Sequence, residues 1–259
     1  MKPKAIILFA PGTNRDSDVC QALELAGACT EVVPLSLLRD RLIRLADYQI
    51  MVIPGGFSYA DALGAGKLLA LDLKEYFAEE IGRFVQQGKP VLGICNGFQA
   101  LVKSGILPDV PSIEAPQATL TFNDSGHFEC RWVTLAPVSQ TCIWTRALEE
   151  PIFCPIAHGE GKFVPAAQNI LEQMRMGDQI ALTYCNEDGS PAQGRYPVNP
   201  NGSVLDIAGI SNPQGNVLGL MPHPENHVLF HQHPRRTRGE RNGSGLPLFV
   251  NGVRYAAEM

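Results

Sequence analysis

One cysteine of this chain stands in a pattern that favours nucleophilic chemistry. Cys95 is the centre of residues 93–97, Gly-Ile-Cys-Asn-Gly, with a glycine two positions to either side. The apolar residues before it predict a buried strand and those after it a helix, which is the arrangement of a nucleophile elbow with sulfur in place of the serine oxygen. The dipole at a helix N-terminus favours thiolate over thiol. We therefore predict that Cys95 is a nucleophile and interpret the other cysteines as packing residues.

A histidine and a glutamate can supply the base that such a thiol needs. His223 and Glu225 belong to residues 221–225, Met-Pro-His-Pro-Glu, at the end of a predicted strand. In an extended chain, residues two apart point to the same side, so Glu225 can hold one ring nitrogen and leave the other for Cys95. Alone, this stretch also fits a solvated surface loop. Together with the elbow it predicts a Cys-His-Glu triad.

A glycine pair follows another predicted strand. Residues 54–57 are Pro-Gly-Gly-Phe, and they end the strand at the carboxyl edge of the expected sheet, where sites of α/β proteins form. A backbone without side chains can turn an N–H toward a carbonyl under attack. With the N–H of Asn96 this would form an oxyanion hole. An ordinary strand-end turn is the alternative interpretation.

The first hundred residues predict the scaffold for this chemistry. Apolar strands are expected at 4–9, 30–33, 49–53 and 91–94, with helices between them that begin at residue 16 or 17, at about 67, and at 96. The second of these helices is expected to run to about residue 87. Alternating strands and helices with short links predict a parallel sheet with helices on both faces.

The sequence pattern changes after Pro108. Residues 119–123 and 128–135 alternate around a turn at 123–126, which predicts a β-hairpin. Residues 180–185, 207–211 and 216–221 also predict antiparallel strands. We expect a single α/β domain over residues 1–259, with an open, mostly parallel, flavodoxin-like sheet and antiparallel strands in the C-terminal half. A polar Gly/Arg-rich loop is expected at about 234–245 and a terminal helix at about 246–259.

The composition excludes several classes of protein. The chain has 259 residues, with 21 lysines and arginines against 26 acidic residues, and a net charge of −5 argues against a generic nucleic-acid binder. Apolar residues make up 45%, but no apolar run approaches the ~18 residues of a membrane helix. The 7 cysteines are scattered without a Cys-x-x-Cys pair, which disfavours a disulfide framework or a zinc cage. We expect a cytoplasmic protein that binds neither nucleic acid nor a membrane.

These motifs together resemble the class I (triad-type) glutamine amidotransferases, and in particular the glutaminase subunits of phosphoribosylformylglycinamidine synthases. The resemblance extends over residues 1 to about 227, and the segments that carry it are 54–59, 93–99, 157–161, 199–203 and 221–225. It implies that the chain hydrolyses glutamine through a cysteine thioester. The ammonia would pass to a synthetase subunit that converts formylglycinamide ribonucleotide to formylglycinamidine ribonucleotide in purine biosynthesis.

The resemblance also assigns roles to individual residues. It makes Cys95 the nucleophile, His223 the base and Glu225 its partner, with Gly56 and Asn96 as oxyanion donors. The residues that it places against the bound glutamine are Phe57, Gln99, His158, Gly159 and Glu160. Gln99 also lies one helical turn beyond the nucleophile, on the same face. The chain departs from the family where it has Ala60, Ala62 and Gly64 in place of Gly, Tyr and Arg, which leaves the contacts of that loop open.

The second half-reaction needs a partner, because the amide oxygen must be activated, commonly by ATP. The sequence has no Gly-x-x-x-x-Gly-Lys-Ser/Thr motif, so we expect no cofactor in this chain. ATP and Mg²⁺ would belong to a large synthetase subunit, joined by a small bridging subunit. The Arg-rich stretch 235–241 would contact this partner or be a solvated loop. His227, His231 and His233 lack a second ligand group, so we expect no metal site.

Three other functions stay open at this point. The chain would be another class I amidotransferase, a cysteine hydrolase of similar fold, or a scaffold module without catalysis. Hydrolases of the stress-protein or intracellular-protease kind typically take their histidine close behind the cysteine. Here His223 follows Cys95 far along the chain, and the complete triad argues against a scaffold.

Overall fold

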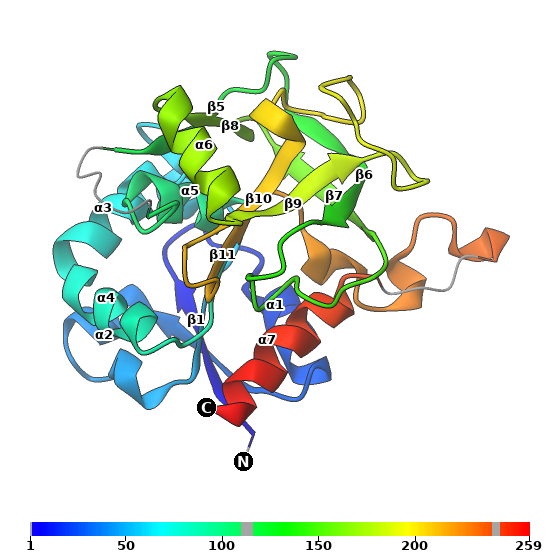
Figure 1. Ribbon diagram of the computed structural model, residues 1–259. Coiled ribbons are helices and arrows are strands. Elements are labelled where there is room, and N and C mark those ends of the chain that lie inside the picture. The colour runs from blue at the N-terminus through cyan, green and yellow to red at the C-terminus, as the bar shows by residue number, and fades with distance from the viewer. Residues whose placement is uncertain (1, 110–115, 240–243) are drawn as a thin grey trace.

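The strands of the chain form a sheet that runs through both halves of the sequence. The structure is a computed structural model that describes residues 2–109, 116–239 and 244–259. Within these residues, nine strands pair in the order β2-β1-β3-β4-β11-β10-β9-β6-β7 (Figure 1). The sheet is therefore continuous from the N-terminal strands to those of the C-terminal half.

One half of the sheet is parallel. Its strands are β1 (Lys4–Phe9), β2 (Cys29–Pro34), β3 (Ile50–Ile53), β4 (Val91–Ile94) and β11 (Val217–Leu220). Every residue of β3, β4 and β11 is buried, as is expected of short apolar strands that are covered on both faces. The order 2-1-3-4 is flavodoxin-like, as predicted.

The other half of the sheet is antiparallel. It contains β6 (Glu129–Pro137), β7 (Ile152–His158), β9 (Ile180–Cys185) and β10 (Ile207–Ser211). The predicted pair on either side of the turn at 212–215 is confirmed, because β10 pairs with β11 in antiparallel register. In β7, buried residues alternate with less buried ones, which is the period of a strand with one covered face.

Helices cover both faces of the parallel half. α1 (Asp16–Leu25) and α7 (Leu246–Glu258) pack against each other on one side, and α3 (Lys67–Tyr76), α4 (Ala78–Gln86) and α5 (Asn96–Lys103) lie on the other (Figure 1). The other described helices, 3₁₀ turns aside, are α2 (Leu35–Arg39) and α6 (Gln168–Met176). The predicted terminal helix is present as α7, while part of the predicted loop 234–245 lies outside the described residues.

Two predictions about elements are wrong. The expected hairpin does not form, because β5 (Ala118–Thr121) pairs instead with β8 (Lys162–Pro165) in a separate two-stranded sheet. The turn at 123–126 carries the chain from this small sheet to the large one. The expected helix over 67–87 is two helices, because Phe77 leaves the helical conformation at φ −126°. Its buried ring fixes the chain where α3 ends and α4 begins.

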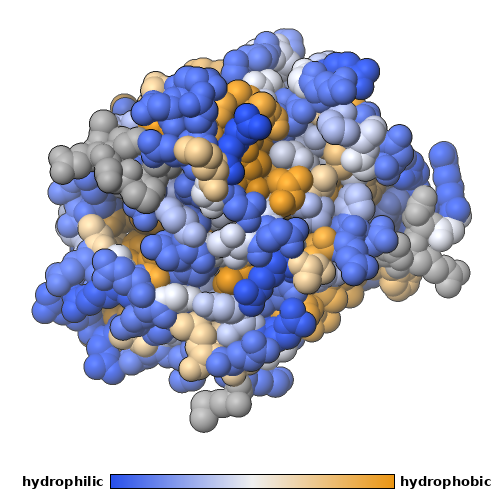
Figure 2. Space-filling view, viewed as in Figure 1, coloured by the Kyte–Doolittle hydropathy of each residue, from blue (hydrophilic) through white to orange (hydrophobic). Residues whose placement is uncertain are grey.

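The surface of the molecule is largely hydrophilic on the face drawn in Figure 2, with apolar side chains gathered in smaller patches between polar ones. Exposed apolar side chains include Phe57 and Leu63, which follow β3, and Phe122 and Phe128, which flank the turn at 123–126. Among the described residues, none of the helices has the length and apolar character needed to cross a membrane.

Candidate active site

Cys95 occupies the sharp turn between β4 and α5. Its backbone has φ 50° and ψ −104°, a conformation that costs an L-residue about 1–3 kcal/mol and is typical of functional sites. The side chain is 5% exposed, and its Sγ atom lies 3.7 Å from the carbonyl oxygen of Ala157. The strand-turn-helix context predicted for this residue is therefore present.

The turn requires glycine two residues later. A Cβ added to Gly97 would lie 1.9 Å from the carbonyl oxygen of Ile53, the last residue of β3. Helix α5 can begin this close to β3 only without a side chain at that position. The glycine thus brings the start of α5 against the strand that leads to the glycine pair.

His223 and Glu225 lie beside the cysteine. The Nδ1 atom of His223 is 2.7 Å from Oε1 of Glu225, and both side chains are buried. The backbone N–H of His223 donates to the carbonyl oxygen of Pro155 at 2.8 Å, which fixes the residue against β7. A Cβ on Gly55 would lie 2.8 Å from His223 Cε1 and 3.5 Å from Cys95 Cβ, so both residues meet at this glycine. The structure thus brings the three predicted triad residues together.

The charge of His223 is set by its neighbours. Burial alone lowers the pKa of this imidazole, but the carboxylate of Glu225, together with the charge and hydrogen bond of Cys95, raises it to about 10. At neutral pH the ring is therefore an imidazolium between a carboxylate and a sulfur. The proton held on this imidazole can be donated to the leaving group of a substrate that is bound to the sulfur.

Replacing Glu225 with glutamine should lower the pKa of His223 by about 1–3 pH units, because an opposite charge in contact is removed. The raised pKa stabilises the fold fully below the ordinary histidine pKa near 6.5, and this contribution is lost as the pH rises through about 10. Titration of the imidazole by ¹⁵N NMR in both proteins measures the change. An unchanged pKa in the variant would contradict this electrostatic account.

The predicted oxyanion donors follow two neighbouring strands, Gly56 after β3 and Asn96 after β4. Asn96 is the first residue of α5, so its backbone N–H has no partner within the helix. The chain around Gly56 is held by neighbouring bonds, because the N–H of Phe57 donates to the carbonyl of Gly12 at 3.0 Å. The Asn96 side chain accepts from the backbone N–H of Ser58 at 3.2 Å and from its hydroxyl at 2.5 Å. It thereby ties the segment after the glycine pair to the start of α5.

The residues predicted to contact glutamine differ in exposure and in how many hydrogen bonds they already make. Phe57 is 47% exposed, whereas Gln99 is 2% exposed and has both ends of its amide engaged. Gln99 Oε1 accepts from Asn96 at 3.1 Å, and Nε2 donates to the carbonyl of Glu160 at 2.7 Å. The glutamine contact of Gln99 stays a prediction, and the geometry gives the residue a second role in positioning Glu160.

His158 ends β7 as a neutral, buried ring. Burial, with a smaller effect from the nearby His223 charge, lowers its pKa to about 4. Nδ1 lies 3.1 Å from Oδ1 of Asn123, which also accepts from the N–H of Gly161 at 3.0 Å. Asn123 Nδ2 donates to the carbonyl of His158 at 2.9 Å. One asparagine therefore fixes the turn that contains His158, Gly159 and Glu160.

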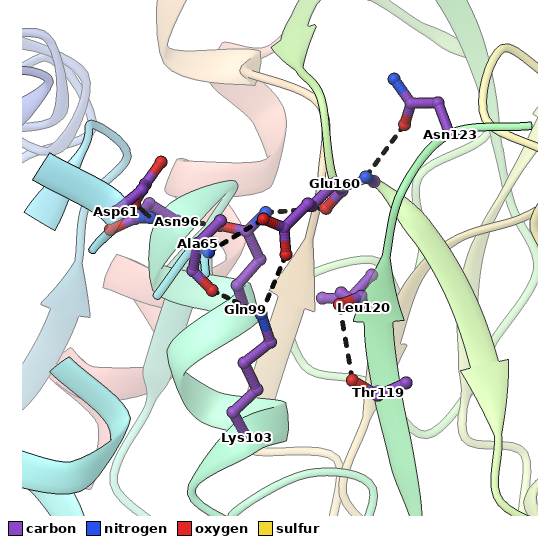
Figure 3. Close-up of polar contacts among 10 residues, drawn as sticks. Asp61, Ala65, Asn96, Gln99, Lys103, Thr119, Leu120, Asn123 and Glu160 are labelled. Carbon is purple, nitrogen blue, oxygen red and sulfur yellow. Dashed lines mark hydrogen bonds and ion pairs between the residues drawn. The ribbon is translucent and has the colours of Figure 1, made fainter. Parts of the chain in front are cut away.

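Several residues that shape this site carry no clear signal in the sequence. The sequence predicts Asn123 only as part of a turn and predicts no role for Ser58 or Asp61, although Asp61 accepts from Asn96 at 2.9 Å. Lys103 contacts Glu160 at 3.2 Å (Figure 3). For Asn123, the polar Asn-Asp-Ser-Gly run was a signal, but a hairpin explained it equally well. Nothing in the sequence pointed to Lys103.

The glycine at position 64 leaves space beside Glu160. A Cβ on Gly64 would lie 3.9 Å from Glu160 Oε2 and 4.0 Å from Lys103 Nζ. The cation next to Glu160 thus comes from α5 and not from residue 64. Ala60 adopts φ 55°, in the left-handed region that favours glycine. Nothing in the structure explains the alanines at 60 and 62.

The histidines after the triad are packed together. His227 and His233 have ring centroids 5.1 Å apart and lie against Trp132 and Phe153. In the part of the chain that the structure describes, no group of three or more His, Cys, Asp or Glu side chains could hold a metal ion. Of the Arg-rich stretch, Arg235 lies 3.3 Å from Glu187, while Arg241 is outside the described residues.

Comparison with known proteins agrees with the class that the fold and site suggest. Residues 2–256 match the CobB/CobQ-like glutamine amidotransferase domain, and the chain belongs to this family. It is 53% identical to the phosphoribosylformylglycinamidine synthase subunit PurQ of Treponema denticola, over 98% of this chain and 99% of that protein. The PurQ subunit of Dehalococcoides mccartyi is 45% identical, over 100% of this chain and 99% of that protein. The chain is therefore a member of the PurQ family.

A solved structure supports the same assignment. The chain is similar to one in the structure of PurLQS from Thermotoga maritima, with a TM-score of 0.74 and 34% identity over 98% of this chain and 99% of that one. This similarity extends to the antiparallel half of the sheet, and the α/β fold predicted from the sequence is confirmed.

Proposed function

We propose that this chain is the glutaminase subunit of a phosphoribosylformylglycinamidine synthase. The observation that carries the proposal is the contact of Cys95, His223 and Glu225 at the carboxyl edge of the sheet, in a chain 53% identical to a PurQ subunit. The chain would supply ammonia for the conversion of formylglycinamide ribonucleotide to formylglycinamidine ribonucleotide. The long separation of cysteine and histidine and the family membership both speak against the hydrolase alternative.

The proposed reaction begins at the sulfur. The Cys95 thiolate attacks the side-chain carbonyl carbon of glutamine, and the N–H groups of Gly56 and Asn96 stabilise the oxyanion that forms. The C–N bond then breaks as His223 gives its proton to the departing ammonia. Water, activated by the now neutral His223, cleaves the thioester to glutamate and restores the thiolate. Glu225 keeps the imidazole oriented throughout.

The remaining residues of the site would bind the substrate. We propose that Phe57, Gln99, His158, Gly159 and Glu160 line the glutamine pocket, because they surround the start of α5 and the end of β7. His158, neutral and fixed by Asn123, would present its Nε2 as an acceptor. The turn 158–161 is held by bonds to three other segments, which favours a preformed pocket.

The amidine-forming step would take place on other chains. We propose a large synthetase subunit that uses ATP and Mg²⁺, together with a small bridging subunit, as partners, and the cytosol as the compartment. The similarity to a chain of a PurLQS structure supports the partners. The seven free cysteines favour a reducing compartment.

The coupling between subunits gives the test of this function. The isolated chain should release glutamate from glutamine only slowly, and addition of the synthetase subunits with ATP and the acceptor should raise the rate at least about tenfold. Waste of glutamine is avoided if hydrolysis waits for the acceptor. Glutamate release is measured with and without each component. Full-speed hydrolysis by the chain alone would count against coupling, and no stimulation by any synthetase would count against the assignment.

A further inference from the structure

A half-buried lysine closes a ring of contacts next to the site. Lys103 Nζ lies 2.6 Å from the carbonyl oxygen of Ala65 and 3.2 Å from Oε2 of Glu160. Oε1 of the same glutamate accepts from the N–H of Ala65 at 3.1 Å (Figure 3). One peptide residue is therefore gripped at both its N–H and its C=O by an ion pair. We call Ala65, Lys103 and Glu160 the Ala65 clasp.

The clasp is shielded from water. The side chains of Lys103 and Glu160 are 16% and 17% exposed, so their attraction is screened less than that of a surface pair. Asp61 is the other acid close by, and its pKa is raised mainly by burial and also by the charge of Glu160, while Lys103 acts in the opposite direction. Without the lysine, the effect of the Glu160 charge on Asp61 would no longer be opposed by the ammonium group.

The clasp joins the parts of the chain that surround the triad. Lys103 is the last residue of the helix that begins just after Cys95, Ala65 lies near the end of the loop that follows the glycine pair, and Glu160 follows β7. A Cβ on Gly66 would lie 2.8 Å from Gln99 Cβ and 3.0 Å from the Asn96 carbonyl. The end of this loop therefore rests on the first turn of α5.

The loop needs such an external hold. Tyr59, Asp61 and Leu63 have φ of 54°, 50° and 65°, in the left-handed region that costs a non-glycine residue free energy. Contacts from outside must keep the loop in this form. Asn96 holds its beginning through Ser58 and Asp61, and the clasp holds its end.

We propose that Lys103 is a positioning residue for glutamine binding, which locks the loop 62–66 and Glu160 into one wall of the pocket. The inference rests on the proposed function. The lysine acts through Glu160, whose carbonyl is also held by Gln99 at 2.7 Å. Losing the charge should loosen this wall without touching the thiol or the imidazole.

The test separates binding from thiol reactivity in the full-length chain. Lys103→Met keeps most of the aliphatic stem and removes the charge. The half-saturating concentration of the glutamine analogue 6-diazo-5-oxo-L-norleucine for inactivation should rise about 10- to 100-fold, the scale expected when a binding group is misplaced. The rate of alkylation of Cys95 by iodoacetamide should stay within about twofold of wild type. In the complex, KM for glutamine should rise by the same factor while ammonia-dependent synthesis is unchanged.

Controls distinguish the clasp from a general effect of charge or folding. Lys103→Arg should keep near wild-type half-saturation. Lys67 is an exposed lysine that lines a surface pocket together with Lys103 and Glu160, and Lys67→Ala should have no effect. Glu160→Gln combined with Lys103→Met should weaken labelling no more than the larger single change, because both act through one pair. The inference alone would be overturned if Lys103→Met and wild type had equal half-saturating concentrations. It would also be overturned if Lys103→Met slowed alkylation by iodoacetamide as much as it weakened labelling by the glutamine analogue. A wild-type chain that the glutamine analogue does not label even in the assembled complex with ATP and the acceptor would overturn the proposed function with it.

Discussion

Replacing Cys95 with alanine should abolish glutamine-dependent amidine formation by the assembled complex and leave ammonia-dependent synthesis intact. The thioester cannot form without sulfur, and loss of a nucleophile that acts together with its base costs about 10⁶-fold in kcat. Ammonia supplied from solution would bypass the glutaminase step, since we propose that the amidine is made on another chain. Both activities are measured on the same purified complex, with either glutamine or an ammonium salt as the nitrogen donor.

A second cysteine provides the matched control for this variant. Cys130 is exposed on β6, so Cys130→Ala should keep both activities. Loss of both activities in Cys95→Ala would contradict the assignment, because the sulfur would then be needed for more than the glutaminase step. Retention of both would falsify the assignment of Cys95 as the nucleophile.

Replacing Gly97 with alanine should produce the largest loss of stability among the single methyl additions considered for the site. The new Cβ would meet the carbonyl oxygen of Ile53 at 1.9 Å, and this backbone atom belongs to a fully buried strand. Helix α5 must then move away from β3, at a cost of about 3 kcal/mol. Cys95 and Asn96 move with it, so glutaminase activity should fall about 100-fold in the fraction that folds. Urea unfolding and glutamate release measure the two effects.

A glycine in another helix shows what the same substitution does without a clash. Nothing lies within 4 Å of a Cβ built on Gly82 in α4. Gly82→Ala should therefore stabilise the protein by about 0.5–1 kcal/mol, because alanine loses less backbone entropy in a helix. If both variants were equally stable, close packing of α5 on β3 would not be the reason for the glycine at 97.

The residues of the proposed triad could be predicted from the sequence, whereas their contacts with the surrounding segments could not. The proposed triad of Cys95, His223 and Glu225 could be predicted because these residues follow apolar strands, and strand ends of a parallel sheet gather at one edge. Their chemistry also requires particular residue types at short spacing. The contact between Cys95 and His223 itself depended on β4 and β11 being neighbours, which the alternating pattern alone does not specify.

Pairing between distant segments was less predictable. Residues 119–123 and 128–135 had the pattern and the turn of a hairpin, yet β5 pairs with β8 and β6 with β7 and β9. Strand pairing is decided by which faces are buried together, and a local turn signal does not report that. In the same way, apolar periodicity continued through Phe77, although the chain bends there to bury the ring.

The amino-acid sequence by itself determined the α/β scaffold, the elbow at Cys95 and the residue types of the triad, because these depend on local periodicity, on glycines at fixed spacing and on the chemistry of side chains. Only the tertiary structure decided the partners of Asn123, the clasp of Lys103 on Ala65 and Glu160, and the raised pKa of His223. These features arise from distances between segments far apart in the chain and from exclusion of water around them. These distances and this exclusion of water are defined only once the chain has folded.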